Sequence, residues 1–277
     1  MKTKTLYISD LDGTLLNSNK DVSEYTRDTL NSLIKKGVHF SIATARTAAS
    51  AVKILSGLNL NLPVLLMNGV VVYDIPNGNY IKIESIPQET VINVIRVLKE
   101  HSLTGFMYSI NNNDLTTYYE ALNTQALKDF YDERITRYYK SFEQTESFLD
   151  KVSTGKTVYF AVINEYDKLI SAFNSLKKYP NIDSVLYRDI YANDQWYLEI
   201  HSNAASKYNA AKYLRKYGRF DKVVGFGDNL NDIPLFRACE ESYAMSNAVE
   251  ELKEMATGII ANNNEDGVAR FIAQKEL

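Results

Sequence analysis

Acidic, hydroxyl and basic side chains follow several predicted strands of this sequence, or open the helix that comes next. The first group is Asp10-Leu11-Asp12-Gly13-Thr14-Leu15, in which two carboxylates lie two residues apart directly after an apolar run. Thr44 ends a second apolar run, Lys207 opens a predicted helix, and residues 227–232 (Gly-Asp-Asn-Leu-Asn-Asp) follow a third run. Because a buried carboxylate is stable only beside a cation or a proton, these groups predict a charged site.

The charge balance of these groups suits a phosphate monoester. The substrate carries about two negative charges, and Asp10 and Asp228 add two more, so the cluster needs Mg²⁺ and a fixed cation such as Lys207. Mg²⁺ favours octahedral oxygen sites built from one or two carboxylates, waters and a substrate phosphate, which matches Asp10 and Asp228. The cofactor expected from the residues is therefore Mg²⁺.

The same residues offer the groups that phosphoryl transfer requires. A carboxylate nucleophile splits one difficult displacement into two easier steps. Asp12 would protonate the leaving oxygen and then activate water, and Thr44 and Lys207 would hold the transferring oxygens. Taken singly, Lys207 also fits a solvated surface lysine, and Asp228 fits an ordinary loop residue. Their joint occurrence at strand ends and helix starts indicates a site.

The elements that must position these residues alternate between strand and helix. We expect strands over 5–9, 38–44 and 63–67, separated by helices over 23–36 and 47–55. A turn-rich stretch predicts a hairpin of 70–73 and 80–84. From residue 207 we expect helices over 207–217, 230–238, 248–256 and 267–274, and strands over 222–226 and 242–245. This order is typical of a parallel sheet, whose ligand crevice lies at the carboxyl ends of the strands.

A long segment interrupts this alternation. It predicts a helix over 87–101, a strand over 157–163, a helix over 166–178 and strands over 182–188 and 196–200, whereas the Tyr- and Asn-rich stretch 104–139 gives no clear assignment. We therefore predict an α/β protein with a Rossmann-like, doubly wound parallel core formed by residues 1–84 and 199–277. Residues 85–198 form an inserted α+β cap domain.

Composition excludes several classes of protein. The chain has 277 residues, with 31 Lys and Arg against 34 Asp and Glu, so its net charge of −3 disfavours a nucleic-acid partner. The single cysteine, Cys239, allows neither an internal disulfide nor a cysteine-ligated metal cluster. The first apolar run ends at Asp10, and no window approaches the ~18–20 apolar residues that span a bilayer. We expect a soluble, cytoplasmic protein without a membrane partner.

These motifs resemble a known family. Residues 10–16, Thr44, Lys207 and residues 227–232 look like the four motifs of the haloacid dehalogenase superfamily of phosphatases. The large insertion between the second and third motifs resembles the type IIB cap of the Cof-type branch. The pair Asn68-Gly69 and the strand residues 198–200 are also typical of that branch.

The resemblance assigns the reacting groups and the metal ligands. It implies that Asp10 is the nucleophile that becomes an aspartyl phosphate. Asp12 would be the acid/base and would give its backbone carbonyl to Mg²⁺. Asp228 would complete the set of metal-binding residues, Asp10, Asp12 and Asp228.

The resemblance also assigns the residues around the phosphoryl group. It implies that Thr44, Lys207 and Asn231 bind that group. Asp232 would support the metal shell or the lysine, and Arg46 and Asn68 are further supporting residues.

Two positions depart from the family pattern. Ala45 stands where the family usually has glycine before the arginine, and Tyr208 stands where glycine usually follows the lysine. Neither change removes a reacting group, so activity is expected, while the substrate preference is affected if Ala45 crowds the phosphate or Tyr208 narrows the entrance.

The expected function is that of a Mg²⁺-dependent phosphatase acting on small phosphorylated metabolites, with sugar phosphates ahead of pyridoxal phosphate and nucleotides. The cap would select the leaving group. Its many tyrosines suit a sugar ring, and Arg188, Asp189, Tyr191 and Asn193 are candidate contacts. The alternatives are a sugar phosphomutase and a non-catalytic phosphate-binding protein. We expect a monomer or a weak homodimer.

Overall fold

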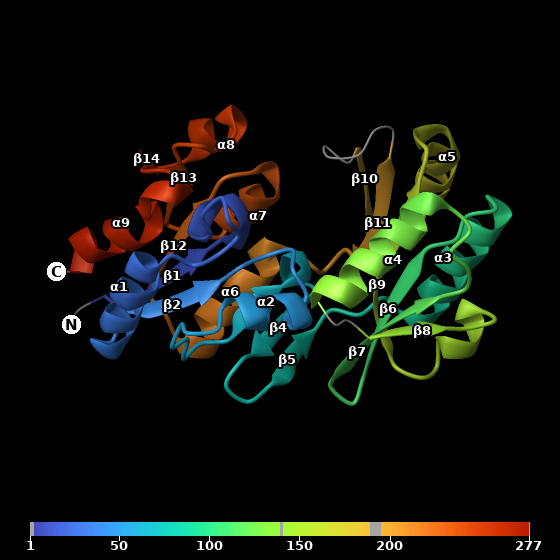
Figure 1. Cartoon of the computed structure of the whole chain (residues 1–277), viewed down its shortest axis with the longest axis horizontal. Coiled ribbons are helices and arrows are strands. Elements are labelled where there is room, and N and C mark those ends of the chain that lie inside the picture. The colour runs from blue at the N-terminus through green and yellow to red at the C-terminus, as the bar shows by residue number, and fades with distance from the viewer. Residues whose placement is uncertain (1–2, 139–140, 189–194, 277) are drawn as a thin grey trace. The chain divides into compact units, whose positions relative to one another are not determined.

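The computed structural model describes residues 3–138, 141–188 and 195–276. The chain divides into two compact units, both visible in Figure 1. The core unit comprises Met1–Lys82 and Ala205–Leu277, and the inserted unit comprises Ile83–Ala204.

A five-stranded parallel sheet forms the centre of the core unit. Its order is β14-β13-β12-β1-β2, and Ile8 of β1 lies opposite Gly225 of β12 and Ser41 of β2. The strands are β1 (Thr5–Ser9), β2 (His39–Ile42), β12 (Lys222–Gly227), β13 (Glu241–Met245) and β14 (Gly258–Ile260). Because β12, β1 and β2 are neighbours, their carboxyl ends meet at one edge of the sheet.

Helices cover both faces of this sheet. Leu6 and Ile8 of β1 pack with Ala211 and Leu214 of α6 on one face. On the other face, Phe226 of β12 contacts the ring of Phe271 of α9. The helices of the core unit are α1 (Glu24–Lys35), α2 (Ala48–Ile54), α6 (Lys207–Gly218), α7 (Ile233–Arg237), α8 (Glu250–Met255) and α9 (Gly267–Glu276). The predicted α/β class is confirmed.

Local signals set the helix ends. The Ser23 hydroxyl accepts a hydrogen bond from the Thr26 N–H and caps α1, as expected. The predicted helix over 230–238 is wrong in its first part. A 3₁₀ turn, Leu230–Asp232, precedes the short α7, and Pro234 lies in the first turn of α7, because Asn229 and Asp232 form a capping box there.

The third predicted strand of the core is joined to the parallel sheet by a single β-bridge and belongs to another sheet. β3 (Val64–Leu66) makes a single parallel bridge between Leu65 and Ala43, and then pairs antiparallel with β4 (Val71–Asp74). With β5 (Asn79–Ile83) these strands form a separate three-stranded sheet, which contains the expected hairpin.

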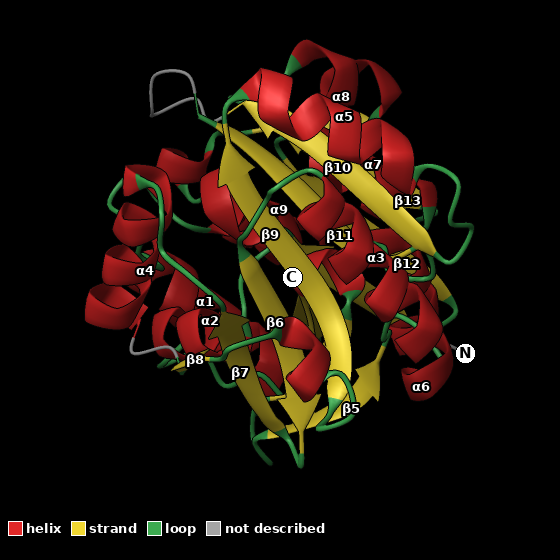
Figure 2. Cartoon of the chain, turned by 90° about the vertical axis from the view of Figure 1, so that its right-hand side faces the viewer, coloured by secondary structure: helices red, strands yellow, loops and turns green. Residues whose placement is uncertain are grey.

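The inserted unit is built on a six-stranded sheet of order β10-β11-β9-β6-β7-β8. Its strands are β6 (Phe106–Asn111), β7 (Asp114–Tyr119), β8 (Phe142–Gln144), β9 (Lys156–Asn164), β10 (Ile182–Arg188) and β11 (Trp196–Ser202), and its helices are α3 (Gln88–Glu100), α4 (Gln125–Tyr138) and α5 (Tyr166–Leu176). Figure 2 shows α4 on the opposite side of the long strands from α3 and α5.

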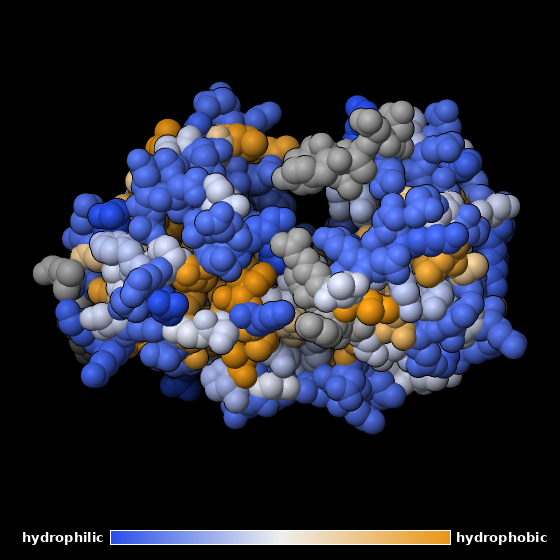
Figure 3. Space-filling model, viewed as in Figure 1, coloured by the Kyte–Doolittle hydropathy of each residue, from blue (hydrophilic) through white to orange (hydrophobic). Residues whose placement is uncertain are grey.

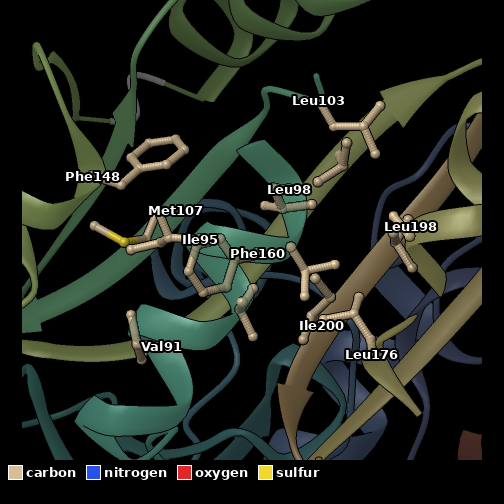
Figure 4. Close-up of a cluster of buried hydrophobic side chains, with 14 of the residues drawn as sticks. Val91, Ile95, Leu98, Leu103, Met107, Phe148, Phe160, Leu176, Leu198 and Ile200 are labelled. Carbon is tan, nitrogen blue, oxygen red and sulfur yellow. The ribbon is translucent and has the colours of Figure 1, made fainter. Parts of the chain in front are cut away.

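The face beneath α3 and α5 holds the main apolar core of the inserted unit. Side chains from β6, β9 and β11 meet those of α3 and α5, as Figure 4 shows for Leu98, Met107, Phe160, Leu176 and Leu198. Because successive strand residues point to opposite faces, the intervening residues of these strands lie on the α4 face. The inserted unit therefore has its own core.

The return to the core unit comes later than residue 199. β11 lies between β9 and β10 and pairs antiparallel with both, with Ile200 opposite Phe160 and Ser184. The expected boundary would cut this strand in its middle. The compact units instead change at Ala204 and Ala205.

The surface seen in Figure 3 is mostly hydrophilic over each unit. Among the described residues, no helix combines the length and the hydropathy that crossing a membrane requires.

Candidate active site

The predicted site residues of the core unit gather at the carboxyl edge of its parallel sheet. Asp10 follows β1, Thr44 lies just beyond β2, and Asp228 follows β12. Lys207 is the first residue of α6, where the Ser206 hydroxyl caps the helix by accepting from the Asn209 N–H. The fold of the core unit thus brings together Asp10 and Lys207, which lie 197 positions apart in the chain.

Lys207 is the central cation of this site. Its Nζ atom donates to Asp10 Oδ1 at 2.5 Å and to Asp232 Oδ1 at 2.6 Å. Lys207 is 1% exposed and Asp232 is fully buried. Burial alone would lower the pKa of Lys207, but the two carboxylates more than offset it, so that its pKa is raised. The lysine therefore stays charged.

The acidic groups outnumber this one cation. Burial and the neighbouring Asp232 carboxylate raise the pKa of Asp10 well above its usual range, although Lys207 partly offsets them. Burial, followed by the charge of Asp232, raises the pKa of Asp228 to about 6. Both shifts arise first from burial and then from the neighbouring carboxylate, so an added positive charge would favour the ionised form of each group.

A divalent cation fits this donor set. Asp10, Asp228 and Asp232 each offer a carboxylate oxygen within 4.8 Å of the others. Asp232 is already engaged, because its Oδ1 accepts from Lys207 and its Oδ2 accepts from the N–H groups of Asp228 and Asn229. Asp10 and Asp228 thus remain as the carboxylates best suited to a hard cation, which would also relieve the excess charge.

The acidic turn after β1 is shaped around Asp228. Gly13 has a positive φ of 76°, and a Cβ atom there would overlap the Asp228 carboxylate. The Thr14 hydroxyl donates to Asp228 Oδ1 at 3.0 Å. Glycine therefore allows both the backbone turn and the close approach of the two acidic loops.

Arg46 holds Asp12 through two hydrogen bonds. Its Nε donates to Asp12 Oδ2 at 2.7 Å, and its Nη2 donates to Asp12 Oδ1 at 2.6 Å. Its Nη1 donates to the Ser50 hydroxyl at 2.9 Å. The side chain of Asp12 is half exposed, so it is a carboxylate accessible to a ligand and oriented by a fixed guanidinium.

Hydrogen bonds link Thr44, Asn68 and Asn231. The Thr44 hydroxyl accepts from the Arg46 N–H at 3.2 Å, and the Thr44 carbonyl accepts from the Asn68 N–H at 2.9 Å. Asn231 Nδ2 donates to Asn68 Oδ1 at 3.4 Å. Asn68 is left-handed with φ 54°, and Gly69 packs so closely on Ser206 that no Cβ fits there. This turn therefore lies against the start of α6, beside Lys207.

The remaining sequence candidates belong to the inserted unit or adjoin Lys207 and Thr44 in the chain. Arg188 ends β10 of the inserted unit, whereas Asp189, Tyr191 and Asn193 fall outside the described residues. Tyr208 accepts a hydrogen bond from Lys212 one turn further along α6, and Ala45 is exposed.

Three contacting residues were not predicted. Thr14, within the first motif, donates to the Asp228 carboxylate. Asn247 donates to the backbone carbonyl of Gly13, and Asn263 donates to that of Leu16. The rule that polar residues after parallel strands face the crevice applies to both asparagines, because they follow β13 and β14.

Comparison with known proteins identifies the family of the chain. The model of the haloacid dehalogenase-like hydrolase family matches residues 7–272, and the chain therefore belongs to that family. Relatives that match nearly the whole of this chain are named phosphatases, in agreement with the resemblance noted from the sequence motifs.

Three proteins illustrate the likeness. The pyridoxal phosphate phosphatase YbhA of Escherichia coli is 25% identical over 98% of both chains. Phosphatase YwpJ of Bacillus subtilis is 24% identical over 95% of this chain and 96% of its own. The solved subclass IIB sugar phosphatase BT4131 is 18% identical, with a TM-score of 0.74 over 99% of both chains.

Proposed function

We propose that this protein is a Mg²⁺-dependent phosphatase that hydrolyses small phosphorylated metabolites, sugar phosphates first, through an aspartyl phosphate on Asp10. The observation that carries the proposal is the buried Asp10–Lys207–Asp232 triad beside Asp228. It combines a carboxylate and a fixed cation with further acidic groups, whose negative charge a divalent cation would balance when a phosphate binds.

In the first step, a carboxylate oxygen of Asp10 attacks phosphorus and the bond to the leaving oxygen breaks. Asp12 gives its proton to that oxygen, so the product leaves as an alcohol. Since Arg46 holds both oxygens of Asp12 in this structure, one of these hydrogen bonds must open when Asp12 carries the proton.

In the second step, Asp12 takes a proton from water as the water attacks the aspartyl phosphate. The phosphorus–oxygen bond to Asp10 breaks, and inorganic phosphate and the free carboxylate are restored. Lys207, the Thr44 hydroxyl and the Asn231 amide offer the donors that would hold the phosphoryl oxygens.

Asp10, Asp228 and the backbone carbonyl of Asp12 would hold Mg²⁺. Asp232 would position Lys207 and the backbone of Asp228, and Thr14 would position the Asp228 carboxylate. The bound ion supplies charge neutralisation between the carboxylates and the dianionic substrate. The raised pKa of Asp228, about 6, supports a cation requirement, because a second positive charge would favour its ionised form.

The inserted unit supports sugar phosphates as the preferred class. Tyr108, Tyr159, Tyr187, Tyr197 and Glu199 share the α4 face of its sheet, since they lie opposite one another or two apart along paired strands. The Tyr187 hydroxyl donates to Glu199 Oε1 at 2.8 Å. Tyr108 is buried, but Tyr187 is 40% exposed, and an exposed aromatic ring beside a carboxylate suits a polyhydroxylated ring.

The test is phosphate release from a panel of sugar phosphates, nucleotides and pyridoxal phosphate, with and without Mg²⁺. Pyridoxal phosphate is included because the Escherichia coli relative is named for it. We expect Mg²⁺-dependent release that is greatest for a sugar phosphate and absent in the folded Asp10→Asn variant.

Three other outcomes would each refute part of the proposal. If the folded protein with Mg²⁺ releases phosphate from no compound, the phosphatase proposal fails. Conversion of one sugar phosphate isomer to another without release would favour a mutase instead. Highest activity on pyridoxal phosphate would refute the sugar preference alone.

A further inference from the structure

Asn247 connects a loop outside the four motifs to the first acidic turn. It lies between β13 and α8, and its Nδ2 donates to the backbone carbonyl of Gly13 at 2.9 Å. Gly13 directly follows Asp12 and has a positive φ of 76°. The bond therefore holds the Gly13–Thr14 peptide group, one peptide beyond the carbonyl of Asp12, in this left-handed turn.

A second asparagine holds Asn247 in place. Asn247 Oδ1 accepts from the backbone N–H of Asn263 at 3.2 Å. Asn263 Nδ2 in turn donates to the carbonyl of Leu16 at 2.8 Å. The two side chains thus bind the acidic turn at its middle and just after its end.

The same loop also binds the second acidic loop. The Val249 N–H donates to the backbone carbonyl of Asp228 at 3.0 Å. One short segment, residues 247–249, is therefore hydrogen-bonded to the turn that carries Asp12 and to the residue that carries the Asp228 carboxylate. It is in a position to set the separation of the two loops.

We infer that Asn247 is a positioning residue for the metal site, acting through Gly13 and supported by Asn263. The inference rests on the proposed function, because it assumes that Asp10, Asp12 and Asp228 bind a divalent cation. Asn247 is exposed, so its hydrogen bonds compete with water and add little to folding stability. Their effect is to hold the ligands in the geometry that Mg²⁺ requires, since Mg²⁺ tolerates little deviation from an octahedron.

Asn31 provides a matched control in the same unit. Its Nδ2 donates to the carbonyl of Gly57 at 2.8 Å, and its Oδ1 accepts from the N–H of Asn59 at 2.8 Å. Gly57 also has a positive φ, of 94°. Asn31 therefore makes the same pair of contacts as Asn247, but to a loop that carries none of the proposed ligands.

The experiment compares Asn247→Ala with Asn31→Ala in the full chain. Mg²⁺ alone is titrated into metal-free protein and followed by calorimetry and by the rise in Tm, and kcat and KM are then measured over a range of Mg²⁺. Loss of one positioning hydrogen bond predicts a Mg²⁺ dissociation constant about three- to tenfold higher in Asn247→Ala. Asn31→Ala should bind Mg²⁺ as the wild type does, although both variants lose similar Tm without metal.

Equal Mg²⁺ affinity in Asn247→Ala and wild type would overturn the inference while leaving the metal site intact. A wild-type protein that does not respond to Mg²⁺ would instead remove the proposed metal site, and the positioning role with it. If Asn247→Ala does not fold, Asn263→Ala tests the same linkage at Leu16, with weaker Mg²⁺ binding expected and unchanged binding contradicting the inference.

Discussion

Lys207 brings a positive charge to the cluster of Asp10, Asp228 and Asp232, and it donates hydrogen bonds to Asp10 and Asp232. Removing one partner of a buried ion pair leaves the other charge without compensation, which costs far more than the net worth of the pair. At the residue scale, the stability of this site therefore depends on Lys207 more than on any one acidic group.

Lys207→Met is expected to lower the free energy of unfolding by about 3 kcal/mol in metal-free protein at neutral pH. The reason is that Asp10 and Asp232 would remain buried without their cation. Denaturation by urea measures this change. Lys222→Met is the control, because Lys222 pairs with Glu241 at a partly exposed position and should cost less than about 1 kcal/mol. Equal losses in the two variants would contradict the account.

Asp228 makes stability depend on pH in a predictable direction. Its pKa is raised from 3.8 to about 6 in the folded protein, so between these values the folded state binds more protons than the unfolded state. The free energy of unfolding should therefore fall as the pH rises through this window.

The measurement compares wild type with Asp228→Asn in metal-free buffer from pH 4 to 7. We expect wild type to lose stability relative to the variant as the pH rises, and Mg²⁺ to restore it in wild type alone. A difference that is constant with pH would show that Asp228 is not perturbed as described.

At the element scale, the turn after β1 is the part of the fold on which the site depends most. It must hold a left-handed residue at Gly13 and approach the carboxylate of Asp228 closely. These are separate demands, because many glycines in turns have free space around them.

Gly13→Ala and Gly37→Ala separate the two demands. Both residues have positive φ, but a Cβ at Gly37 meets no atom within 4 Å, whereas one at Gly13 overlaps Asp228. Both variants should lose about 1 kcal/mol or more of stability from backbone strain. Only Gly13→Ala should lose Mg²⁺ binding and phosphatase activity; comparable activity in the two variants would be the contrary result.

Elements with local signals could be predicted from the sequence. The strand ending at Ser9 and the helix capped by Ser23 were predicted because their signals, the spacing of apolar residues and a capping residue, lie within the element or next to it. The helix α4 was not assigned, since it buries few apolar side chains, among them Leu127 and Phe130. The hairpin of β6 and β7 was not assigned either, because β6 is buried at polar as well as apolar positions and shows no clear alternation. β14 was also missed, because three residues carry too little pattern.

At the scale of the whole molecule, the chain consists of an inserted unit within a core unit. The inserted unit is continuous in sequence and has its own apolar core. The predicted second boundary falls inside β11, because strand partners are not local in the sequence. β11 belongs to the inserted unit because it pairs with β9 and β10. The residues around position 199 do not by themselves indicate these partners.

This architecture predicts how fragments behave. A fragment of residues 83–204 should fold cooperatively, because it keeps all six strands of its sheet. A fragment of residues 85–198 should not, because it cuts β11 after Leu198 and leaves residues 182–185 of β10 without their partners. Thermal unfolding by circular dichroism tests both; a cooperative transition in the shorter fragment would place the boundary where the sequence suggested.

The site also joins distant residues. Asp10 and Lys207 were predicted together because each begins or follows an element of the parallel core, and the topology then gives their proximity. The bidentate contact of Arg46 with Asp12 and the links of Asn247 depend on side-chain geometry, which spacing along the chain does not encode.

The most direct test is whether Asp10 carries the phosphoryl group. Asp12→Asn protein, with Mg²⁺, is mixed with p-nitrophenyl phosphate, whose leaving group needs no proton, and is quenched in acid for mass spectrometry. We predict one phosphoryl group per chain on the peptide containing Asp10, and none in the Asp10→Asn, Asp12→Asn double variant. Release of p-nitrophenol by the wild type with no phosphoryl group on the single variant, or a group on another residue, would contradict the account.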